Sequence, residues 1–392
     1  MLDEPAFIER LIEVADGPPA EVATGLDGLD PDRVAAALLT EVAARAELHH
    51  GPSRPLTVQF LLCHNGHELA YRLTVGGEAG KVEPGREADP WVTIRQDLAE
   101  LLGQLYGPPG TAGTATREVL MKDEPGPKAW FDDPWQAQRD LASLAVYQVL
   151  AACAEHRLGL TELAARFGSD KFGGHWYTPH YEHHFAPWRD RRLRILEIGI
   201  GGYQAPDLGG ESLRMWKHYF TRGLVYGLDI YDKSAVAQPR VRVLRGSQSD
   251  PEALARIVAE HGPFDVIVDD GSHVNSDVLA SFDALFPTLA PGGLYVVEDV
   301  QTSYWPGAGG SSDDLDRADT SMVAFKRLVD GLNHREMLGD RAENPSPTDN
   351  TVVGVHFYHN LVFVQKGRNA EQPAPGWVSR TQDITSYVHG EG

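Results

Sequence analysis

The sequence predicts a two-domain α/β protein in which a smaller α+β domain precedes a doubly wound, mostly parallel sheet. The chain has 392 residues, more than one ordinary domain contains. From Arg191 onward, short apolar runs alternate with amphipathic segments, the pattern of a parallel sheet covered by helices. Two further apolar runs near the C-terminus indicate a hairpin. We therefore expect one domain over residues 1–150 and a second over residues 151–392.

A β-hairpin is the clearest element of the first domain. Asn65-Gly66, a pair that favours tight hairpin turns, separates the strand-like runs Thr57–Cys63 and Leu69–Val75. The remaining pattern predicts a helix, a short strand, a helix capped by an aspartate, and a long helix, in this order: Val34–Ala46, Trp91–Ile94, a helix after Asp97, and Trp135–Ala154. No constellation in this domain indicates chemistry.

The second domain contains five mainly apolar runs that predict parallel strands: Leu193–Ile198, Leu224–Ile230, Arg240–Leu244, Phe264–Val268 and Leu294–Val297. A helix lies between the third and fourth runs. Asp250 is a suitable N-cap for this helix, Pro251 suits its first position, and Gly262 ends it.

The last two apolar runs, Val352–Phe357 and Leu361–Gln365, predict an antiparallel hairpin. A seven-stranded, mostly parallel sheet closed by such a hairpin is typical of the Rossmann-like class I methyltransferase fold. A dinucleotide dehydrogenase usually lacks the hairpin. The ending therefore favours the methyltransferase type of doubly wound fold.

The charge of the chain argues against nucleic-acid and membrane partners. Lys and Arg number 35 against 56 Asp and Glu, a net charge of −21, so the chain has no general attraction to anionic polymers or lipids. No run of about 18 apolar residues occurs, and Met1–Glu4 lacks the basic start of a signal peptide. Cys63 and Cys153 are best interpreted as reduced thiols. We expect a cytoplasmic protein.

A glycine-rich turn follows the first strand of the second domain. Gly199, Gly201 and Gly202 would let a cofactor approach the backbone closely. The dinucleotide fingerprint has a third glycine where Gln204 stands, and the acidic Glu197 before the turn is instead a feature of S-adenosylmethionine sites. A plain tight turn is the alternative.

Two further residues are candidates for the same nucleoside site. Asp229 ends the second strand, where a carboxylate can accept the ribose hydroxyls. Gln248 lies in the loop after the third strand and could bond the adenine edge, whereas Asp250 in that loop is better explained as a helix cap.

The strongest chemical signal is acidic. Asp269 and Asp270 follow the fourth strand, and Glu298 and Asp299 end the fifth. Parallel neighbouring strands bring their carboxyl ends to one edge of the sheet, where ligands bind in open α/β folds. We expect Asp270, Glu298 and Asp299 to hold Mg²⁺ or Mn²⁺, because all-oxygen ligation suits these ions. The alternative is that Asp269 caps a helix and Glu298 faces solvent.

His273 stands three residues beyond Asp270 in the same loop. A histidine is mostly neutral near pH 7 and can take a proton from a polarised hydroxyl, so His273 is a candidate general base. A surface or capping histidine is the alternative.

The segment from Ser169 to Tyr181 is too aromatic and polar for an ordinary linker. It could fold over the cofactor, which would make Tyr177 and Thr178 cofactor contacts. Its histidines could instead form an exposed helix face.

Eight blocks of the chain together resemble the macrolide sugar O-methyltransferases. They lie between about residues 160 and 370: Lys171–Tyr181, Arg194–Tyr203, Ser212–Trp216, Gly227–Lys233, Gly262–Asn275, Tyr295–Asp299, Tyr304–Gly310 and Val353–Gly367. The N-terminal third matches only in length and general pattern, and the loops Ser311–Asp319 and Arg341–Asn350 do not show the family's pattern.

The resemblance implies an enzyme that uses S-adenosylmethionine and Mg²⁺ to methylate one hydroxyl of a deoxysugar on a natural product. It assigns the metal, which binds two adjacent sugar hydroxyls, to Asp270, Glu298 and Asp299, and the general base to His273. Direct in-line transfer of the methyl group would follow. It also implies a homo-oligomer, a dimer or a tetramer, whose N-terminal auxiliary domain helps to complete the site.

Three other functions remain open from the sequence. A catechol or other diol O-methyltransferase would use the same metal chemistry. An NAD-dependent oxidoreductase is disfavoured by Glu197, by the missing third glycine and by the terminal hairpin. A binding or assembly protein without catalysis would have no need of Asp270, His273, Glu298 and Asp299 together.

Overall fold

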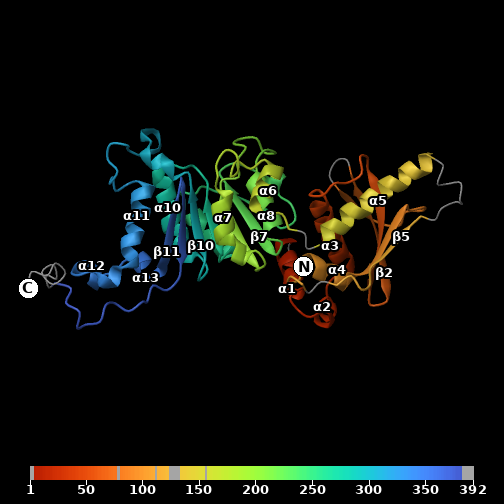
Figure 1. Ribbon diagram of the computed structural model, residues 1–392, viewed down its shortest axis with the longest axis horizontal. Coiled ribbons are helices and arrows are strands. Elements are labelled where there is room, and N and C mark those ends of the chain that lie inside the picture. Colours follow the sequence, from red (N-terminus) through yellow and green to blue (C-terminus); the bar gives the residue numbers. More distant parts are fainter. Residues whose placement is uncertain (1–3, 77–79, 111–112, 123–132, 155–156, 382–392) are drawn as a thin grey trace, which may run out of the picture. The chain divides into compact units, whose positions relative to one another are not determined.

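The computed structural model describes residues 4–76, 80–110, 113–122, 133–154 and 157–381 (Figure 1). The chain divides into two compact units, Met1–Arg245 and Gly246–Gly392. The segment at residues 123–132, where Pro125 and Pro127 disfavour a helix, lies outside the described residues. Each unit is built from the predicted elements and from several that the sequence pattern did not reveal.

The N-terminal region of the first unit holds a five-stranded sheet in the order β3-β2-β1-β4-β5 (Figure 1). The predicted hairpin is confirmed: His64 pairs with His67, and Asn65 and Gly66 both have the positive φ angles that such a turn requires. The strands are β1 Leu56–His64, β2 His67–Val75, β3 Lys81–Pro84, β4 Val92–Asp97 and β5 Glu118–Met121.

Helices pack against this sheet. Helices α3 (Pro31–Ala46) and α5 (Asp133–Cys153) contact each other, and both contact β2. Asp97 caps α4 (Leu98–Tyr106) by accepting from the backbone N–H groups of Ala99 and Glu100, as predicted. Two N-terminal helices were not predicted, α1 Glu4–Val14 and α2 Pro19–Gly25.

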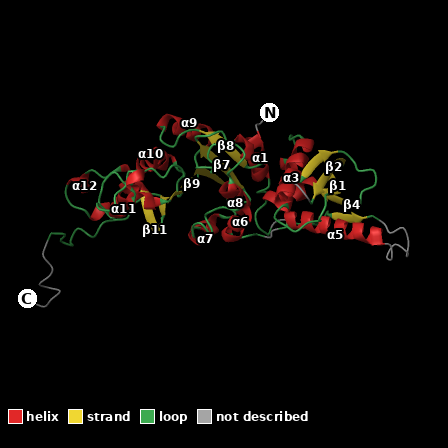
Figure 2. Ribbon diagram, turned by 90° about the horizontal axis from the view of Figure 1, so that it is seen from above, coloured by secondary structure: helices red, strands yellow, loops and turns green. Residues whose placement is uncertain are grey.

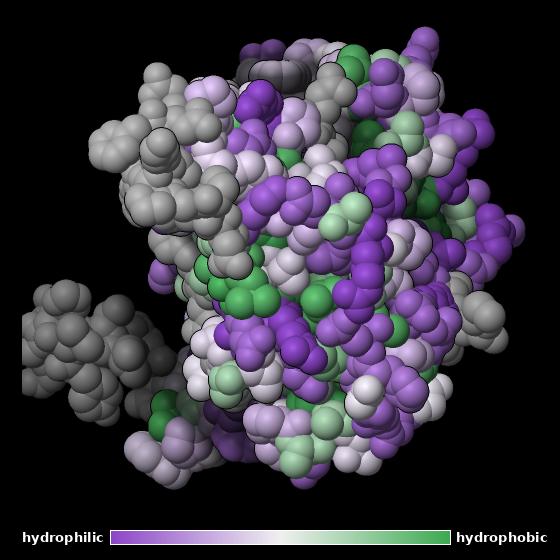
Figure 3. Space-filling view, turned by 90° about the vertical axis from the view of Figure 1, so that its right-hand side faces the viewer, coloured by the Kyte–Doolittle hydropathy of each residue, from purple (hydrophilic) through white to green (hydrophobic). Residues whose placement is uncertain are grey.

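The face of the molecule in Figure 3 is largely hydrophilic, with small scattered hydrophobic patches.

The first unit ends with three parallel strands in the order β6-β7-β8. The elements are α6 Leu160–Phe167, α7 Thr178–Phe185, β6 Leu193–Ile198, α8 Glu211–Tyr219, β7 Gly223–Asp229 and β8 Val241–Arg245. An aromatic core joins α7 to α8, because Tyr181 and Phe185 both pack edge-on against the fully buried Trp216. This core connects the helix before β6 to the helix that follows the glycine turn.

The second unit contains two parallel strands followed by the predicted antiparallel hairpin, in the order β11-β12-β10-β9. Its strands are β9 Val266–Asp269, β10 Leu294–Glu298, β11 Val352–Tyr358 and β12 Leu361–Lys366. With β6, β7 and β8 they make seven strands after Arg191 in the described part of the chain. The five parallel strands and the terminal hairpin confirm the predicted fold class.

The predicted helix of the second unit is confirmed, because Asp250 caps α9 (Pro251–His261) by accepting from the backbone N–H groups of Glu252 and Ala253. Helix α10 spans Asn275–Leu285. Helix α11 (Ser321–Leu332) packs against α10 and β11 (Figure 2). Two short helices, α12 Asp340–Glu343 and α13 Pro347–Thr351, precede β11. Among the described residues, no helix is long and apolar enough to span a membrane.

Candidate functional site

The predicted acidic residues of the second unit meet at the carboxyl ends of β9 and β10. Val297 pairs with Asp269 in the parallel register, so the next residues, Asp270 and Glu298, leave the two strands side by side. Carboxylate oxygens of Asp270 and Glu298 lie within 4.8 Å of each other. The parallel pairing thus brings together side chains that are 28 positions apart in the sequence.

His273 belongs to the same cluster. Its Nε2 atom lies 3.5 Å from Asp299 Oδ2 and 3.9 Å from Asp270 Oδ1. All three side chains are partly exposed, whereas Glu298 is buried. The cluster therefore offers a solvent-accessible edge made of carboxylate oxygens and one imidazole.

This donor set fits a divalent cation. Several carboxylates gathered within a few ångströms repel one another unless a proton or a cation neutralises them. Oxygen ligands are those that Mg²⁺ and Mn²⁺ prefer, and the imidazole nitrogen is close enough either to join such a set or to accept a proton beside it. Asp270 thus lies near both Asp299 and Glu298, and the ligand set Asp270, Glu298 and Asp299 stays a prediction.

The backbone of this cluster adopts a conformation that L-residues seldom use. His273 has φ = 56° and Asp299 has φ = 53°, both in the left-handed region. Non-glycine residues in this region cost of the order of 1 kcal/mol or more and tend to occur at functional sites. The sequence carried no signal for this feature, because neither residue is a glycine in a turn motif.

Asp269, the last residue of β9, is 1% exposed. Its carboxylate accepts hydrogen bonds from Ser281 Oγ, from Tyr295 OH at 3.3 Å and from Gln248 Nε2 at 3.1 Å. Burial raises the pKa of Asp269 to about 6, although the hydrogen bond from Ser281 and the nearby His273 act in the opposite direction. Asp269 and Gln248 are thus hydrogen-bonded to each other next to Asp270 of the acidic cluster.

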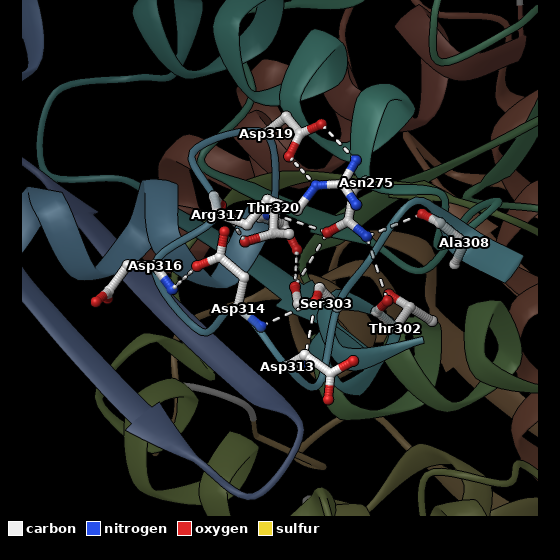
Figure 4. A network of polar contacts seen from close by, with 12 residues as sticks. Asn275, Thr302, Ser303, Ala308, Asp313, Asp314, Asp316, Arg317, Asp319 and Thr320 are labelled. Atoms are coloured by element: carbon white, nitrogen blue, oxygen red, sulfur yellow. Dashed lines mark hydrogen bonds and ion pairs between the residues drawn. The ribbon is translucent and has the colours of Figure 1, made fainter. Parts of the chain in front are cut away.

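The segment that follows Asp299 is fastened by the buried side chain of Asn275 (Figure 4). Asn275 Nδ2 donates to the carbonyls of Thr302 and Ala308, at 3.2 and 2.9 Å, and its Oδ1 accepts from Ser303 Oγ at 3.0 Å. In the adjoining loop, Arg317 forms a two-pronged ion pair with Asp319. The loop Ser311–Asp319, which does not show the family's pattern, thus contains hydrogen bonds and an ion pair of its own.

The glycine turn of the first unit has the predicted geometry. Gly199, Gly201 and Gly202 have φ angles of 91°, 79° and 70°, which glycine tolerates best. A Cβ atom on Gly202 would lie 2.3 Å from the carbonyl oxygen of Leu208, so only glycine fits there. Asp229 anchors the turn, since its carboxylate accepts from the backbone N–H groups of Ile200 and Tyr231 at 3.0 and 2.9 Å.

Glu197 has a partner that the sequence analysis did not identify. Its side chain is fully buried, 3.3 Å from the equally buried Nζ of Lys171, and it accepts a hydrogen bond from Ser212 Oγ at 2.8 Å. Lys171 belongs to the aromatic segment before β6, so this ion pair fastens that segment to the strand. Lys171 and Glu197 are 26 positions apart, so their pairing depends on the fold, and the sequence carried no local signal for it.

The aromatic segment itself is a closed loop. Phe172 and Trp176 form an isolated bridge and an edge-to-face ring contact, and Trp176 remains 66% exposed. Tyr177 and Thr178 are buried: the ring of Tyr177 stacks on His175, and the hydroxyl of Thr178 lies 3.0 Å from that of Thr161. Tyr177 and Thr178 are therefore buried in the segment that the Lys171–Glu197 ion pair holds, and their contacts with the cofactor stay a prediction.

Comparison with known proteins identifies the family to which this chain belongs. A family model described as the MycE methyltransferase N-terminal region matches residues 8–117, and a methyltransferase domain model matches residues 149–300. Demethylmacrocin O-methyltransferase of Streptomyces fradiae is 41% identical over 97% of this chain and 96% of its own length. This chain belongs to the macrolide sugar O-methyltransferase family. It is therefore an O-methyltransferase, which decides against an oxidoreductase or a non-enzymatic scaffold.

Other members of the family are similarly close. Mycinamicin VI 2''-O-methyltransferase of Micromonospora griseorubida is 39% identical over 98% of this chain and 96% of that protein. A rhamnosyl tetracenomycin-C 2'-O-methyltransferase of Streptomyces olivaceus is 42% identical over 98% of this chain and 100% of that protein. The solved MycE methyltransferase in complex with Mg, S-adenosylhomocysteine (SAH) and mycinamycin VI has a TM-score of 0.86 at 37% identity, with all of both chains covered.

Proposed function

We propose that this enzyme transfers a methyl group from S-adenosylmethionine to one hydroxyl of a deoxysugar on a glycosylated natural product of the macrolide type, with Mg²⁺ or Mn²⁺ as metal. The acidic cluster of Asp270, His273 and Asp299, with Glu298 adjoining, is the observation that carries the proposal. Family members named for macrolide and rhamnosyl substrates, and a solved relative with Mg and a macrolide bound, support the choice of acceptor.

In this proposal Asp270, Glu298 and Asp299 hold the metal. A bound divalent cation supplies Lewis acidity that makes a sugar hydroxyl more acidic. His273 accepts the hydroxyl proton at Nε2, the ring atom that faces Asp270 and Asp299. In-line attack of the hydroxyl oxygen on the sulfonium methyl would form the O–C bond as the C–S bond breaks, with S-adenosylhomocysteine as the leaving group.

The proposed cofactor contacts lie around the glycine turn. Gly199, Gly201 and Gly202 let the nucleoside approach the backbone, and Asp229, whose side chain already orders this turn, lies at the position for the ribose hydroxyls. Glu197 with its partner Lys171 orders the start of the turn. Tyr177, Thr178 and Asp269 complete the proposed set of cofactor residues.

The organisation of the whole protein is part of the same proposal. Residues 1–150 form an auxiliary domain for oligomerisation and completion of the site, and residues 151–392 form the methyltransferase domain. The match of residues 8–117 to a separate N-terminal family model supports this division. We further propose a dimer or tetramer that works in the cytoplasm.

Calorimetric titration with SAH, with and without Mg²⁺, followed by a methyl-transfer assay, tests the proposal. We expect saturable SAH binding, and methylation of mycinamicin VI or demethylmacrocin that EDTA abolishes and Mg²⁺ restores. Catechol serves as the control acceptor. Methylation of catechol in preference to the glycosides would overturn the sugar assignment, and absence of SAH binding would overturn the cofactor site.

A further inference from the structure

We propose that Gln248 is a positioning residue that holds His273 against the acidic cluster. The inference rests on the proposed function of His273 and assigns Gln248 a role through the protein backbone rather than through the nucleoside. The observation behind it is a bridge: one side-chain amide contacts both the start and the end of the loop that carries Asp270.

The bridge spans the loop between β9 and His273. Gln248 Nε2 donates to Asp269 Oδ1 at 3.1 Å, and Gln248 Oε1 accepts from the backbone N–H of Ser272 at 2.7 Å. The Gln248 side chain is 6% exposed, so these hydrogen bonds form away from water and constrain the loop strongly. Asp269 in turn is held by Ser281 and Tyr295, which lie on α10 and β10.

Ser272 extends the restraint to the other side of His273. The Ser272 hydroxyl accepts from the backbone N–H of Val274 at 3.2 Å and donates to Asp277 Oδ2 at 2.8 Å, at the start of α10. The N–H groups on both sides of His273 are therefore hydrogen-bonded, one through Gln248 and one through Ser272.

Such a restraint is needed because His273 has φ = 56°. A histidine in the left-handed region relaxes to an ordinary conformation unless the surrounding structure over-determines it. Relaxation would rotate the imidazole away from Asp270 and Asp299, which lie 3.9 and 3.5 Å from Nε2. Gln248 thus affects catalysis and metal binding indirectly, because it fixes the position of His273 beside Asp270 and Asp299.

The experiment compares Gln248→Met, which keeps the length of the side chain and removes both hydrogen bonds, with Ser272→Ala and Ser272→Thr. Ser249→Ala is the matched control, because the exposed Ser249 hydroxyl contacts Ser247 in the same loop. Four quantities are measured: kcat, the Mg²⁺ concentration at half-maximal rate, the Mg²⁺ affinity by calorimetry and the Kd for SAH. The crystal structure of Gln248→Met reports the φ angle of His273.

We expect Gln248→Met and Ser272→Ala to lower kcat about 10- to 100-fold and to weaken Mg²⁺ binding, the usual range for residues that support metal ligands. The Kd for SAH should stay within about threefold, as expected of residues that make no contact with the nucleoside. Ser272→Thr should restore the rate because it keeps the hydroxyl, and His273 should leave φ = 56° in the Gln248→Met crystal.

The opposite pattern overturns the inference. A Gln248→Met enzyme with wild-type kcat at saturating cofactor and a much weaker SAH affinity would make Gln248 an adenine contact. If Gln248→Met does not fold, Gln248→Glu takes its place, because it removes the donor to Asp269 and sets a second carboxyl group against that side chain. Unchanged kcat and Mg²⁺ affinity in that variant would reject the bridge. Failure of the wild-type protein to methylate any glycoside is a separate result, because it counts against the proposed function, while the Mg²⁺ affinities and the crystal structure still test the bridge.

Discussion

Two clusters of ionisable side chains in this protein differ in nearly every physical respect. The first unit buries Glu41, Arg45 and Arg240 completely or almost completely, with Glu41 Oε1 at 2.9 Å from Arg45 Nε and 2.7 Å from Arg240 Nη2. The second unit presents Asp270, His273 and Asp299 at a partly exposed edge. One cluster joins opposite charges, whereas the other gathers carboxylates.

The hydrogen bonds and ion pairs within the first cluster show that its role is structural. Arg240 Nη1 also donates to the carbonyls of Lys217, Phe220 and Gly223. Burial alone would raise the pKa of Glu41, but the charges of Arg240 and Arg45 outweigh burial and hold that pKa well below its usual value. These paired charges link helix α3, which carries Glu41, to Arg240, which lies just before β8.

The second cluster is arranged for a ligand rather than for stability. Carboxylates brought within a few ångströms of each other disfavour the folded state until a cation binds. Its two left-handed residues, His273 and Asp299, add backbone strain. The contrast shows that buried, paired charge supports the fold, whereas exposed, concentrated charge indicates chemistry. Substitutions in the two clusters should therefore have different effects, on activity in the second and on stability in the first.

Asp270→Asn should abolish Mg²⁺-stimulated methyl transfer while the protein remains folded. Removing one carboxylate lowers the charge that holds the cation and relieves repulsion, so the melting temperature without metal should stay equal or rise. Activity assays with varied Mg²⁺ and thermal melts provide the measurement. Asp316→Asn, on an exposed loop, is the control. Full Mg²⁺-stimulated activity in Asp270→Asn would show that the metal cluster is misassigned.

His273→Ala should reduce kcat by about 10²–10⁴-fold, the usual contribution of a general base. SAH binding should be retained, because the change removes an imidazole and leaves the glycine turn intact. Single-turnover kinetics and calorimetry on the same preparation separate the two effects. An unchanged turnover would remove His273 from the mechanism.

Glu41→Gln should destabilise the first unit by about 3–5 kcal/mol, because it leaves Arg240 and Arg45 buried without their counter-charge. Urea unfolding measures the change. Glu47→Gln is the control, because the exposed Glu47 lies just after the end of the same helix, and it should change stability by less than about 0.5 kcal/mol. Equal effects of the two substitutions would contradict the structural role of the buried cluster.

Lys217 should make stability depend on pH in the alkaline range. Burial lowers its pKa from 10.5 to about 8, even though Glu41 acts in the opposite direction. Between these two values the unfolded chain binds more protons than the folded one, so stability should rise with pH across that window. Unfolding midpoints in urea between pH 8 and 10 measure the slope. Lys217→Met should lose this part of the slope, and an identical slope in the variant would reject the assignment.

Local patterns predicted much of the fold and the composition of the candidate site. Turn chemistry at Asn65-Gly66 and caps at Asp97 and Asp250 act within a few residues, so they were readable from the sequence. Helix α1 was missed although Phe7, Ile8, Leu11 and Ile12 follow helical spacing. The acidic residues after β9 and β10 were predictable, since parallel strands end at a common edge.

The partners of buried polar groups were decided only by the tertiary structure. Glu41 meets Arg240 across 199 residues, and Gln248 meets Asp269 and Ser272 across more than 20. Their pairing depends on how distant elements pack, which local periodicity does not encode. The left-handed backbone of His273 is of the same kind, because neighbouring hydrogen bonds and not its own residue type impose it. The sequence by itself determined which groups would gather at the sheet edge, and the packing decided how they are held there.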